Sequence, residues 1–430
     1  MVQPRATGHG FRPYAWAETA AQVAARHGLS PAHVLRFDAN LPALPAPLPV
    51  AARRALAERG EYPEGSYAEL RADAASYAGC APAEVVVDAG ADGLLYLVAR
   101  AFLGPGRRAV VPGPTYPVYA IASRGEGAAV DEQPAADLDA LRSAARDAHV
   151  LWLCNPGNPD GRLVRPAEIA VLADALPDTL VCVDEAYFEY CDETVAPLAL
   201  ERDNLVAVRT LSKAFGLAGL RVGYAVASAE VARELTARRS PAPVAGAAAL
   251  LASAALRDPS VARAEIDATR AERARVQRAL ADAGYDAEPT HTNFVYVRTP
   301  DARSISAMLE QKGLVVRAYD DALRMTLRSP GDDDLLLDAL EVDAAPAVCR
   351  SVTVLQPGVR VSLTLDGSGR SSVRTGDDAL DDELETQAHA NGWNLELAAD
   401  DGVGAVVVRA ALAGAEAQAP APAQAPSPSG

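Results

Sequence analysis

Short apolar runs alternate with helical stretches between residues 85 and 208, and this alternation constrains the fold more than any other feature of the chain. The runs span residues 85–87, 109–111, 150–154, 180–183 and 205–208. Near-continuous apolar strands separated by helices are typical of a mainly parallel sheet that is covered on both faces. The pattern therefore predicts an α/β fold. Open sheets of this kind bind ligands beyond the carboxyl ends of their strands, so functional residues are expected there.

A lysine follows the last of these runs, in a chain that uses arginine for nearly every positive charge. Of the 40 lysines and arginines, only Lys213 and Lys312 are lysine. Arginine keeps its proton near neutral pH and cannot form an imine, whereas a desolvated lysine can do both. Ser212 and Arg221 could hold a phosphate dianion beside Lys213. For an isolated Ser-Lys pair, a surface lysine in a glycine-rich loop is the alternative.

The composition excludes several classes of partner. The formal net charge is -17, whereas binding to nucleic acid or to an anionic membrane requires a basic face. The 430 residues, 50% of them hydrophobic, suffice for two or three domains with buried cores. The five scattered cysteines suit a reducing compartment without disulfides or zinc. No signal-peptide core and no apolar run of membrane length occurs, so we expect a cytoplasmic protein.

The stretch from Ser212 to Gly223 reads Ser-Lys-Ala-Phe-Gly-Leu-Ala-Gly-Leu-Arg-Val-Gly. It resembles the cofactor-lysine signature of the fold-type I pyridoxal-phosphate aminotransferases, and further motifs follow in the expected order over roughly residues 35 to 342. Within that family the chain looks most like the histidinol-phosphate aminotransferases. The resemblance implies a large domain with a mainly parallel seven-stranded sheet and a smaller α+β domain. It also implies pyridoxal 5'-phosphate on Lys213 and a homodimer with shared active sites.

A glycine turn, Gly90-Ala91-Asp92-Gly93, opens a helical pattern after the first apolar run. Backbone N–H groups and the helix dipole make such a turn an anion site, although a plain helix cap at Asp92 is the alternative. Gly93 replaces a glutamate that is usual in the family. For Tyr62, which the resemblance places at the cofactor phosphate, an aromatic side chain packed in a turn is an equal alternative. The resemblance implies these contacts to the cofactor phosphate: Gly90, Ala91, Asp92, Ser212, Arg221 and, from the partner subunit, Tyr62.

A carboxylate at the end of an apolar strand is costly unless it has a cationic partner. Asp184 directly follows the run 180–183, and the resemblance makes the pyridinium nitrogen of the cofactor its partner. Tyr187 and Asn158 are implied to hydrogen-bond the phenolate oxygen, and Tyr116 to stack on the ring unless it is a core tyrosine. Asp160 replaces a usual threonine. The implied catalytic residues are Lys213, Asp184 and Tyr187.

Two residues are implied to bind the substrate. Asn40 matches the first residue of the family's Asn-Glu-Asn-Pro motif, but Leu41 and Pro42 replace the next two. Arg324 matches the arginine that holds the anionic group of the substrate, with a solvated edge-strand charge as the alternative. Arg328 stands where a glycine is usual, which could narrow or recharge the substrate end. These departures favour a specialised substrate.

Residues 345 to 412 lie beyond the aminotransferase pattern and resemble the opening of imidazoleglycerol-phosphate dehydratase. Its metal chemistry does not carry over, because Asp382 and Ala390 stand where histidines are expected and only His389 remains in the segment. One histidine is too little for a metal site. We expect a truncated, metal-free remnant used for packing, assembly or substrate gating.

The expected segments are an arm with part of the small domain (1–48), the large cofactor-binding domain (49–242), the small domain (243–343), the remnant (344–412) and a disordered Ala/Pro-rich tail (413–430). The predicted function is pyridoxal-phosphate-dependent transamination between an amino-acid or amino-phosphate donor and a keto acceptor. Ordinary histidinol-phosphate transamination is the alternative, as is an oxidase, cyclase or decarboxylase on the same scaffold. The intact lysine, aspartate, tyrosine and arginine set disfavours a non-catalytic scaffold.

Overall fold

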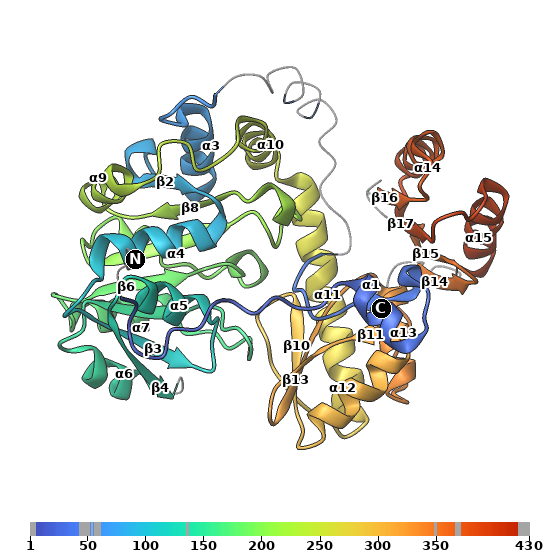
Figure 1. The fold of residues 1–430 in the computed structure, drawn as a ribbon, viewed down its shortest axis with the longest axis horizontal. Coiled ribbons are helices and arrows are strands. Elements are labelled where there is room, and N and C mark those ends of the chain that lie inside the picture. Colours follow the sequence, from blue (N-terminus) through green and yellow to red (C-terminus); the bar gives the residue numbers. More distant parts are fainter. Residues whose placement is uncertain are drawn as a thin grey trace, which may run out of the picture. The chain divides into compact units, whose positions relative to one another are not determined.

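The computed structural model describes residues 6–42, 52, 55, 62–134, 137–347, 351–365 and 371–419 (Figure 1). The chain divides into two compact units, which are treated separately below. The first unit holds Met1–Trp16 and Leu48–Pro259, and the second holds Ala17–Pro47 and Ser260–Gly430. The proline-rich residues 41–49, which predict an extended crossing segment, and residues 49–59, which predict a helix, lie mostly outside the described residues.

A seven-stranded sheet forms the centre of the first unit, with the order β2-β8-β7-β6-β5-β3-β4. β8 runs antiparallel to both of its neighbours, while the pairs among the other strands are parallel. The predicted fold class is therefore confirmed. The strands are β2 (Val85–Asp88), β3 (Arg108–Gly113), β4 (Ala129–Pro134), β5 (Val150–Cys154), β6 (Leu180–Asp184), β7 (Leu205–Thr210) and β8 (Gly223–Val226).

The central strands are apolar because helices exclude water from both faces. Every residue of β6 and β7 is buried, and Trp152 on β5 is completely so. Burying one large apolar side chain stabilises the fold by about 1.5–3 kcal/mol. Apolar residues therefore fill these positions, and the strands can be recognised in the sequence. The helices of this unit are α3 (Ala68–Ala78), α4 (Gly90–Phe102), α5 (Val118–Gly125), α6 (Leu138–Ala145), α7 (Pro166–Asp174), α8 (Ala196–Ala199), α9 (Ala229–Arg238) and α10 (Gly246–Arg257).

The second unit contains an antiparallel sheet with the order β12-β13-β10-β9 and a parallel pair, β1 with β11. Its core is built from these strands and from helices α11 and α13. The elements are α1 (Ala20–His27), β1 (Leu35–Arg36), α11 (Ser260–Asp282), β9 (Asp286–Glu288), β10 (Phe294–Arg298), α12 (Ala302–Gln311), β11 (Leu314–Val315), β12 (Arg317–Ala318), β13 (Ala322–Thr326) and α13 (Pro330–Ala339).

The long helical pattern expected over residues 245 to 284 is two helices, α10 and α11. They are interrupted at Asp258-Pro259, where the proline cannot continue the hydrogen bonding of the first helix. α10 packs against α3 in the first unit, whereas α11 belongs to the second. The division between the units therefore falls later in the chain than residue 242, where we expected it.

The C-terminal part of the second unit, residues 351–419, is called the appendage below. It folds into a four-stranded sheet with the order β14-β15-β17-β16. Its last helix continues to Gln418, so the prediction of a disordered tail from residue 413 is wrong for 413–418, since alanine is a strong helix former. The elements are β14 (Ser351–Gln356), β15 (Val359–Thr364), β16 (Ser371–Arg374), α14 (Asp378–Asn391), β17 (Asn394–Ala399) and α15 (Ala405–Gln418).

Among the described residues, no helix combines the length and the hydropathy that crossing a membrane requires.

Candidate active site

Lys213 lies in the loop that follows the buried strand β7. The Thr210 hydroxyl donates to the Ser212 hydroxyl over 2.9 Å, and the Ser212 N–H donates to the Thr210 hydroxyl over 3.2 Å. These bonds fix the start of the loop. Lys213 Nζ lies 5.8 Å from the centroid of the Tyr187 ring. Two of the three predicted catalytic side chains thus lie together beyond the ends of β6 and β7.

Asp184, the third predicted catalytic residue, ends β6 and is 4% exposed. Its carboxylate accepts from the Tyr119 hydroxyl over 2.8 Å and from the Ala186 N–H over 3.1 Å. Burial raises the pKa of Asp184 to about 6, although the Tyr119 hydrogen bond and the charge of Lys213 act in the opposite direction. The carboxylate is therefore only partly compensated by the protein around it.

Tyr119 is a site residue to which the sequence analysis assigned no role. Its ring stacks on Trp152, with centroids 5.6 Å apart and an interplanar angle of 10°. Trp152 donates in turn to the Ser123 hydroxyl over 3.0 Å. The available signal was its closeness to Tyr116 in the sequence: the two rings meet edge to face, with centroids 5.8 Å apart.

Arg221, Asp92 and Tyr116 form one hydrogen-bonded group at the start of α4. The Asp92 carboxylate accepts from the Arg221 guanidinium and from the Tyr116 hydroxyl, each over 2.9 Å. The Arg221 side chain remains 48% exposed. Three residues predicted to bind the cofactor, far apart in sequence, are therefore side by side.

Two glycines allow this close approach. Gly90 has a φ of +74°, and a Cβ there would lie 2.8 Å from a guanidinium nitrogen of Arg221. A Cβ on Gly223 would lie 2.8 Å from the backbone nitrogen of Ala91, so β8 passes directly against the start of α4. The backbone N–H groups of Gly90 and Ala91, the helix dipole and Arg221 together form a region suited to an anion.

The structure gives a reason for glycine at position 93. A Cβ on Gly93 would lie 2.6 Å from the Asp88 carboxylate, which accepts from the Ala89 N–H over 2.6 Å. Burial raises the pKa of Asp88. A larger side chain at position 93 would therefore collide with the Asp88 carboxylate.

The Asn-Pro-Gly-Asn-Pro turn after β5 is held by its first residue. The Asn155 amide donates to the Val164 carbonyl over 2.9 Å and accepts from the Val164 N–H over 2.8 Å. Asn158 is half-buried in this turn. The Asp160 carboxylate, which replaces a usual threonine, accepts from Arg162 over 2.9 Å. Asp160 is therefore engaged within its own loop.

The side chain of Tyr62 is 95% exposed. It borders a cavity of about 290 Å³ between α10 and the start of α3, also lined by Tyr67 and Leu250. A cofactor contact made from a partner subunit requires an exposed side chain of this kind, but that role of Tyr62 stays a prediction.

Arg324 and Asn40, the predicted substrate-binding residues, lie together in the second unit. Arg324 on β13 is 7% exposed and donates to the Asp38 carbonyl over 2.8 Å. The Asn40 N–H donates to the Thr326 hydroxyl over 2.9 Å, and that hydroxyl donates to the Asn40 side-chain oxygen over the same distance. The segment that carries Asp38 and Asn40 is thereby tied to β13.

Arg317 is a second arginine at this place, and the sequence analysis assigned it no role. It lies on β12 directly opposite Arg324 in the antiparallel pairing, and it is exposed. Directly opposed residues of antiparallel strands project from the same face of the sheet, where two like charges are unfavourable. An anion between the two guanidinium groups would remove that cost.

Arg328 does not recharge the substrate end, contrary to our expectation. Its guanidinium donates to Asp332 over 2.9 Å and to Glu396 of the appendage over 2.5 Å. The side chain is only 9% exposed. Both hydrogen-bonding ends of the group are therefore directed to carboxylates of the second unit.

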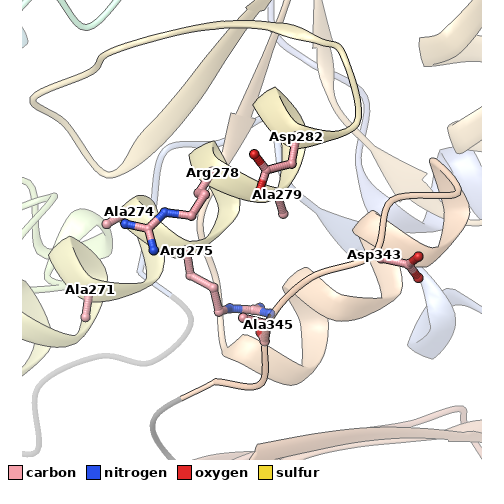
Figure 2. A pocket seen from close by; sticks show the side chains of 8 residues that line it. All are labelled: Ala271, Ala274, Arg275, Arg278, Ala279, Asp282, Asp343 and Ala345. Atoms are coloured by element: carbon pink, nitrogen blue, oxygen red, sulfur yellow. Dashed lines mark hydrogen bonds between the residues drawn. The ribbon is translucent and has the colours of Figure 1, made fainter.

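A cavity of about 250 Å³ beside α11 contains none of the predicted site residues. In Figure 2, Arg275 extends from α11 toward Ala345, whose carbonyl it contacts over 3.0 Å. Arg275 also pairs with Glu272 and with Asp334. The charge of Arg275 is therefore balanced by these two carboxylates. Within the described ranges, no cluster of three or more His, Cys, Asp or Glu side chains could hold a metal ion.

Comparison with known proteins identifies the family to which most of the chain is similar. The family model "Aminotransferase class I and II" matches residues 32–341. Histidinol-phosphate aminotransferase 2 of Caulobacter vibrioides is 36% identical over 345 residues, which cover 77% of this chain and 91% of that protein. Histidinol-phosphate aminotransferase of Limosilactobacillus fermentum is 36% identical over 299 residues, covering 66% and 82%. The family match ends before the appendage.

Solved structures agree with the family match. Histidinol-phosphate aminotransferase from Sinorhizobium meliloti in complex with pyridoxal-5'-phosphate superposes with a TM-score of 0.71 at 28% identity, covering 77% of this chain and 96% of that one. L-threonine-O-3-phosphate decarboxylase from Porphyromonas gingivalis gives a TM-score of 0.63 at 26% identity, covering 72% and 98%.

Proposed function

The chain belongs to the class I and II aminotransferase family, and we propose that its amino donor carries a phosphate ester, as histidinol phosphate does. It is a pyridoxal-phosphate-dependent transaminase that moves an amino group between an amino donor and a keto acceptor. The proposal concerns the donor, and one observation carries it. Arg317 and Arg324 oppose each other on neighbouring strands, and a dianion neutralises such a pair better than a single carboxylate does.

The site residues fit pyridoxal phosphate on two observations. Asp184 is buried with a raised pKa, and a cationic ring nitrogen would supply the compensation that it lacks. Arg221 lies at the start of α4 beside glycines 90 and 223, where a Cβ would close the anion region. The following residues would hold the phosphate: Gly90, Ala91, Asp92, Ser212, Arg221 and, from a partner subunit, Tyr62.

The remaining residues would set the chemistry. When bound, pyridoxal phosphate accepts the electrons released as a bond to the substrate's α carbon breaks. Asp184 would keep the ring nitrogen protonated, with Tyr119 orienting its carboxylate. Tyr116 would stack on the ring, and Asn158 and Tyr187 would hydrogen-bond its phenolate oxygen. Lys213 Nζ would bind the cofactor covalently and, once displaced by the donor, would carry the proton from the α carbon of the donor to the cofactor carbon to which Nζ had been bonded.

The donor can be identified by mixing cofactor-loaded protein with one donor at a time in a single turnover. Histidinol phosphate, glutamate and a panel of basic amino acids are compared, with and without oxygen, by the absorbance of the cofactor. We expect histidinol phosphate to convert the cofactor to its amino form without oxygen. Dephosphorylated histidinol serves as the matched control and should react with a much higher KM. Equal KM values for the two would contradict the phosphate proposal.

A specialised amino acid is the second candidate donor. The observation in its favour is the replacement of two residues of the Asn-Glu-Asn-Pro motif by Leu41 and Pro42, directly after Asn40. Conversion by an amino acid alone, with no reaction of histidinol phosphate, would support it. Absorbance changes that require oxygen would instead indicate an oxidase.

We also propose a homodimer with shared active sites in the cytoplasm. The exposure of Tyr62 supports shared sites, since a side chain that reaches a partner's site must project from the surface of its own chain. The net charge of -17 and the scattered cysteines agree with a cytoplasmic protein. Light scattering would test the dimer, and Tyr62→Phe should weaken cofactor binding if the hydroxyl reaches the phosphate.

A further inference from the structure

Strand β15 of the appendage is buried on both faces, and the two faces differ in character. Val359, Val361 and Leu363 alternate along one face and pack in the core that α14 and α15 share. Arg360 and Ser362 alternate on the other face, and they are only 5% and 3% exposed. Buried polar side chains require partners, so this face must meet a polar surface.

The partner of that face is the start of α13. Asp332 is fully buried there and accepts from the hydroxyl groups of Thr353 and Ser362, each over 2.6 Å. It also accepts from the Arg328 guanidinium over 2.9 Å. Gly331 brings the backbones together, because a Cβ on it would lie 2.6 Å from the carbonyl carbon of Val352.

Glu396 on β17 completes the contact by bridging two arginines. One of its oxygens accepts from Arg360 over 2.6 Å and the other accepts from Arg328 over 2.5 Å. Burial alone would raise the pKa values of Asp332 and Glu396, but the two arginines lower both. Arg328, Asp332, Arg360 and Glu396, called the ionic cluster, therefore hold two positive and two negative charges in balance.

The ionic cluster is attached to the strand that presents Arg324. Arg328 lies two residues after β13, and its guanidinium carbon lies 5.9 Å from the centroid of the Phe37 ring. The Phe37 carbonyl accepts from the Thr326 N–H over 2.7 Å. The next carbonyl along the chain, that of Asp38, accepts from Arg324 over 2.8 Å.

We propose that Arg328 and Glu396 are positioning residues, through which the appendage fixes β13 and the segment 37–40 and thereby sets the affinity for the substrate. Neither residue touches the substrate. The inference rests on the proposed substrate-binding role of Arg324. Both halves of this contact lie outside the family pattern, because Arg328 replaces the family's usual glycine and Glu396 lies beyond the family match, which ends at residue 341.

The test is Glu396→Gln in the full-length, cofactor-loaded protein, which preserves the shape of the side chain and removes its charge. We expect KM for the amino donor to rise about tenfold while kcat changes less than about twofold, because ground-state and transition-state binding weaken together. The affinity for pyridoxal phosphate should not change, since the proposed cofactor residues lie in the first unit. Hydrogen exchange of the amides of β13 should become faster.

Glu383→Gln is the matched control. Glu383 forms an ion pair of 2.6 Å with Arg409 in the same appendage, but the two side chains are 54% and 47% exposed. Its KM and the exchange of β13 should equal those of the unmodified protein. The double variant Arg328→Gln with Glu396→Gln restores the charge balance, so it should recover thermal stability while its KM stays high.

A KM that follows thermal stability through all three variants would overturn the proposal and leave the ionic cluster as a structural clamp alone. An unchanged KM in Glu396→Gln would overturn it as well. If the unmodified protein transaminates no donor, the proposed function fails instead. Exchange of β13 then still decides whether the appendage holds this strand, and an unchanged rate would overturn the inference.

Discussion

The loop end of the seven-stranded sheet and the ionic cluster of the appendage both bury charged side chains, but only the ionic cluster balances them. Asp184 has a pKa raised to about 6 despite Tyr119 and Lys213, and Arg221 remains half exposed beside a helix start. In the ionic cluster, two arginines hold the pKa values of Asp332 and Glu396 below their usual range.

The protein compensates the charge of Asp184 incompletely, whereas it supplies both cations of the ionic cluster itself. Burying a charge costs free energy unless a partner compensates it, so the raised pKa of Asp184 shows that the protein alone compensates this carboxylate incompletely. A carboxylate with a lowered pKa has its cation within the protein. A sequence motif names Asp184 as the partner of a cation, whereas the cations that compensate Asp332 are identified only by the fold.

Replacing Lys213, in the loop after β7, should have the largest effect on transaminase activity. Lys213→Arg keeps the positive charge but cannot form an imine, so we expect transaminase activity to fall by at least about 10⁴-fold. Lys312→Arg is the matched control, since Lys312 is exposed and donates only to the Ala339 carbonyl. Steady-state rates measure both. Residual activity above one per cent in Lys213→Arg would refute the assigned role.

The two arginines on β12 and β13 should differ in their effect. Arg324→Gln leaves the Asp38 carbonyl with a weaker donor and removes a buried charge, so KM for the donor should rise about a hundredfold. Arg317→Gln removes an exposed charge, and its KM should rise about tenfold. The comparison is made with phosphorylated and dephosphorylated donor. If Arg317→Gln affects both donors equally, Arg317 does not contact the phosphate.

The central strands of the first unit could be predicted because both of their faces are buried. β4 could not, because each of its residues is exposed or only half-buried and Asp131 and Glu132 interrupt the apolar pattern. β8 begins at Gly223, inside the cofactor-lysine motif, so its first residue was assigned to the motif and the strand was not predicted. Apolar periodicity therefore reports only the interior of a sheet.

The site was predictable where a motif names the residue, as for Lys213 and Asp184. Tyr119 was not, because its role depends on a hydrogen bond to a strand end 65 residues away. The partners of Arg328 could not be predicted either. The sequence shows an arginine in place of a glycine, but only the fold brings Glu396 of the appendage to it.

A methyl group at the helix start tests the anion region itself. Gly90→Ala should raise the dissociation constant of pyridoxal phosphate about tenfold, because the residue has a φ of +74° and its Cβ would displace Arg221. Gly219→Ala, in the same motif, meets no atom within 4 Å and serves as the control. Titration of the apoprotein with cofactor gives both constants. Equal affinities would mean that this helix start does not hold the phosphate.

The smallest expected effect is on how the free energy of unfolding of the apoprotein depends on pH. It tests the contrast between Asp184 and the ionic cluster most directly. A carboxyl group whose folded pKa is raised stabilises the fold below its unfolded pKa, and that stability is lost as the pH rises through the folded pKa. For Asp184 the window runs from 3.8 to about 6. Asp184→Asn should remove a loss on the order of 3 kcal/mol over this window, since one pKa unit is worth about 1.4 kcal/mol.

Asp332 should behave in the opposite way, because its folded pKa is lowered. Its contribution is present above the unfolded pKa of about 3.9 and is lost as the pH falls through the folded value. Urea unfolding of the apoprotein from pH 4 to 7 compares Asp184→Asn with Asp332→Asn. We expect the first variant to gain stability relative to the unmodified protein as the pH rises, and the second to be destabilised across the whole range. If the free energy of unfolding changed with the same sign and the same pH slope in both variants, the two carboxylates would be compensated alike. The contrast between Asp184 and the ionic cluster would then fail.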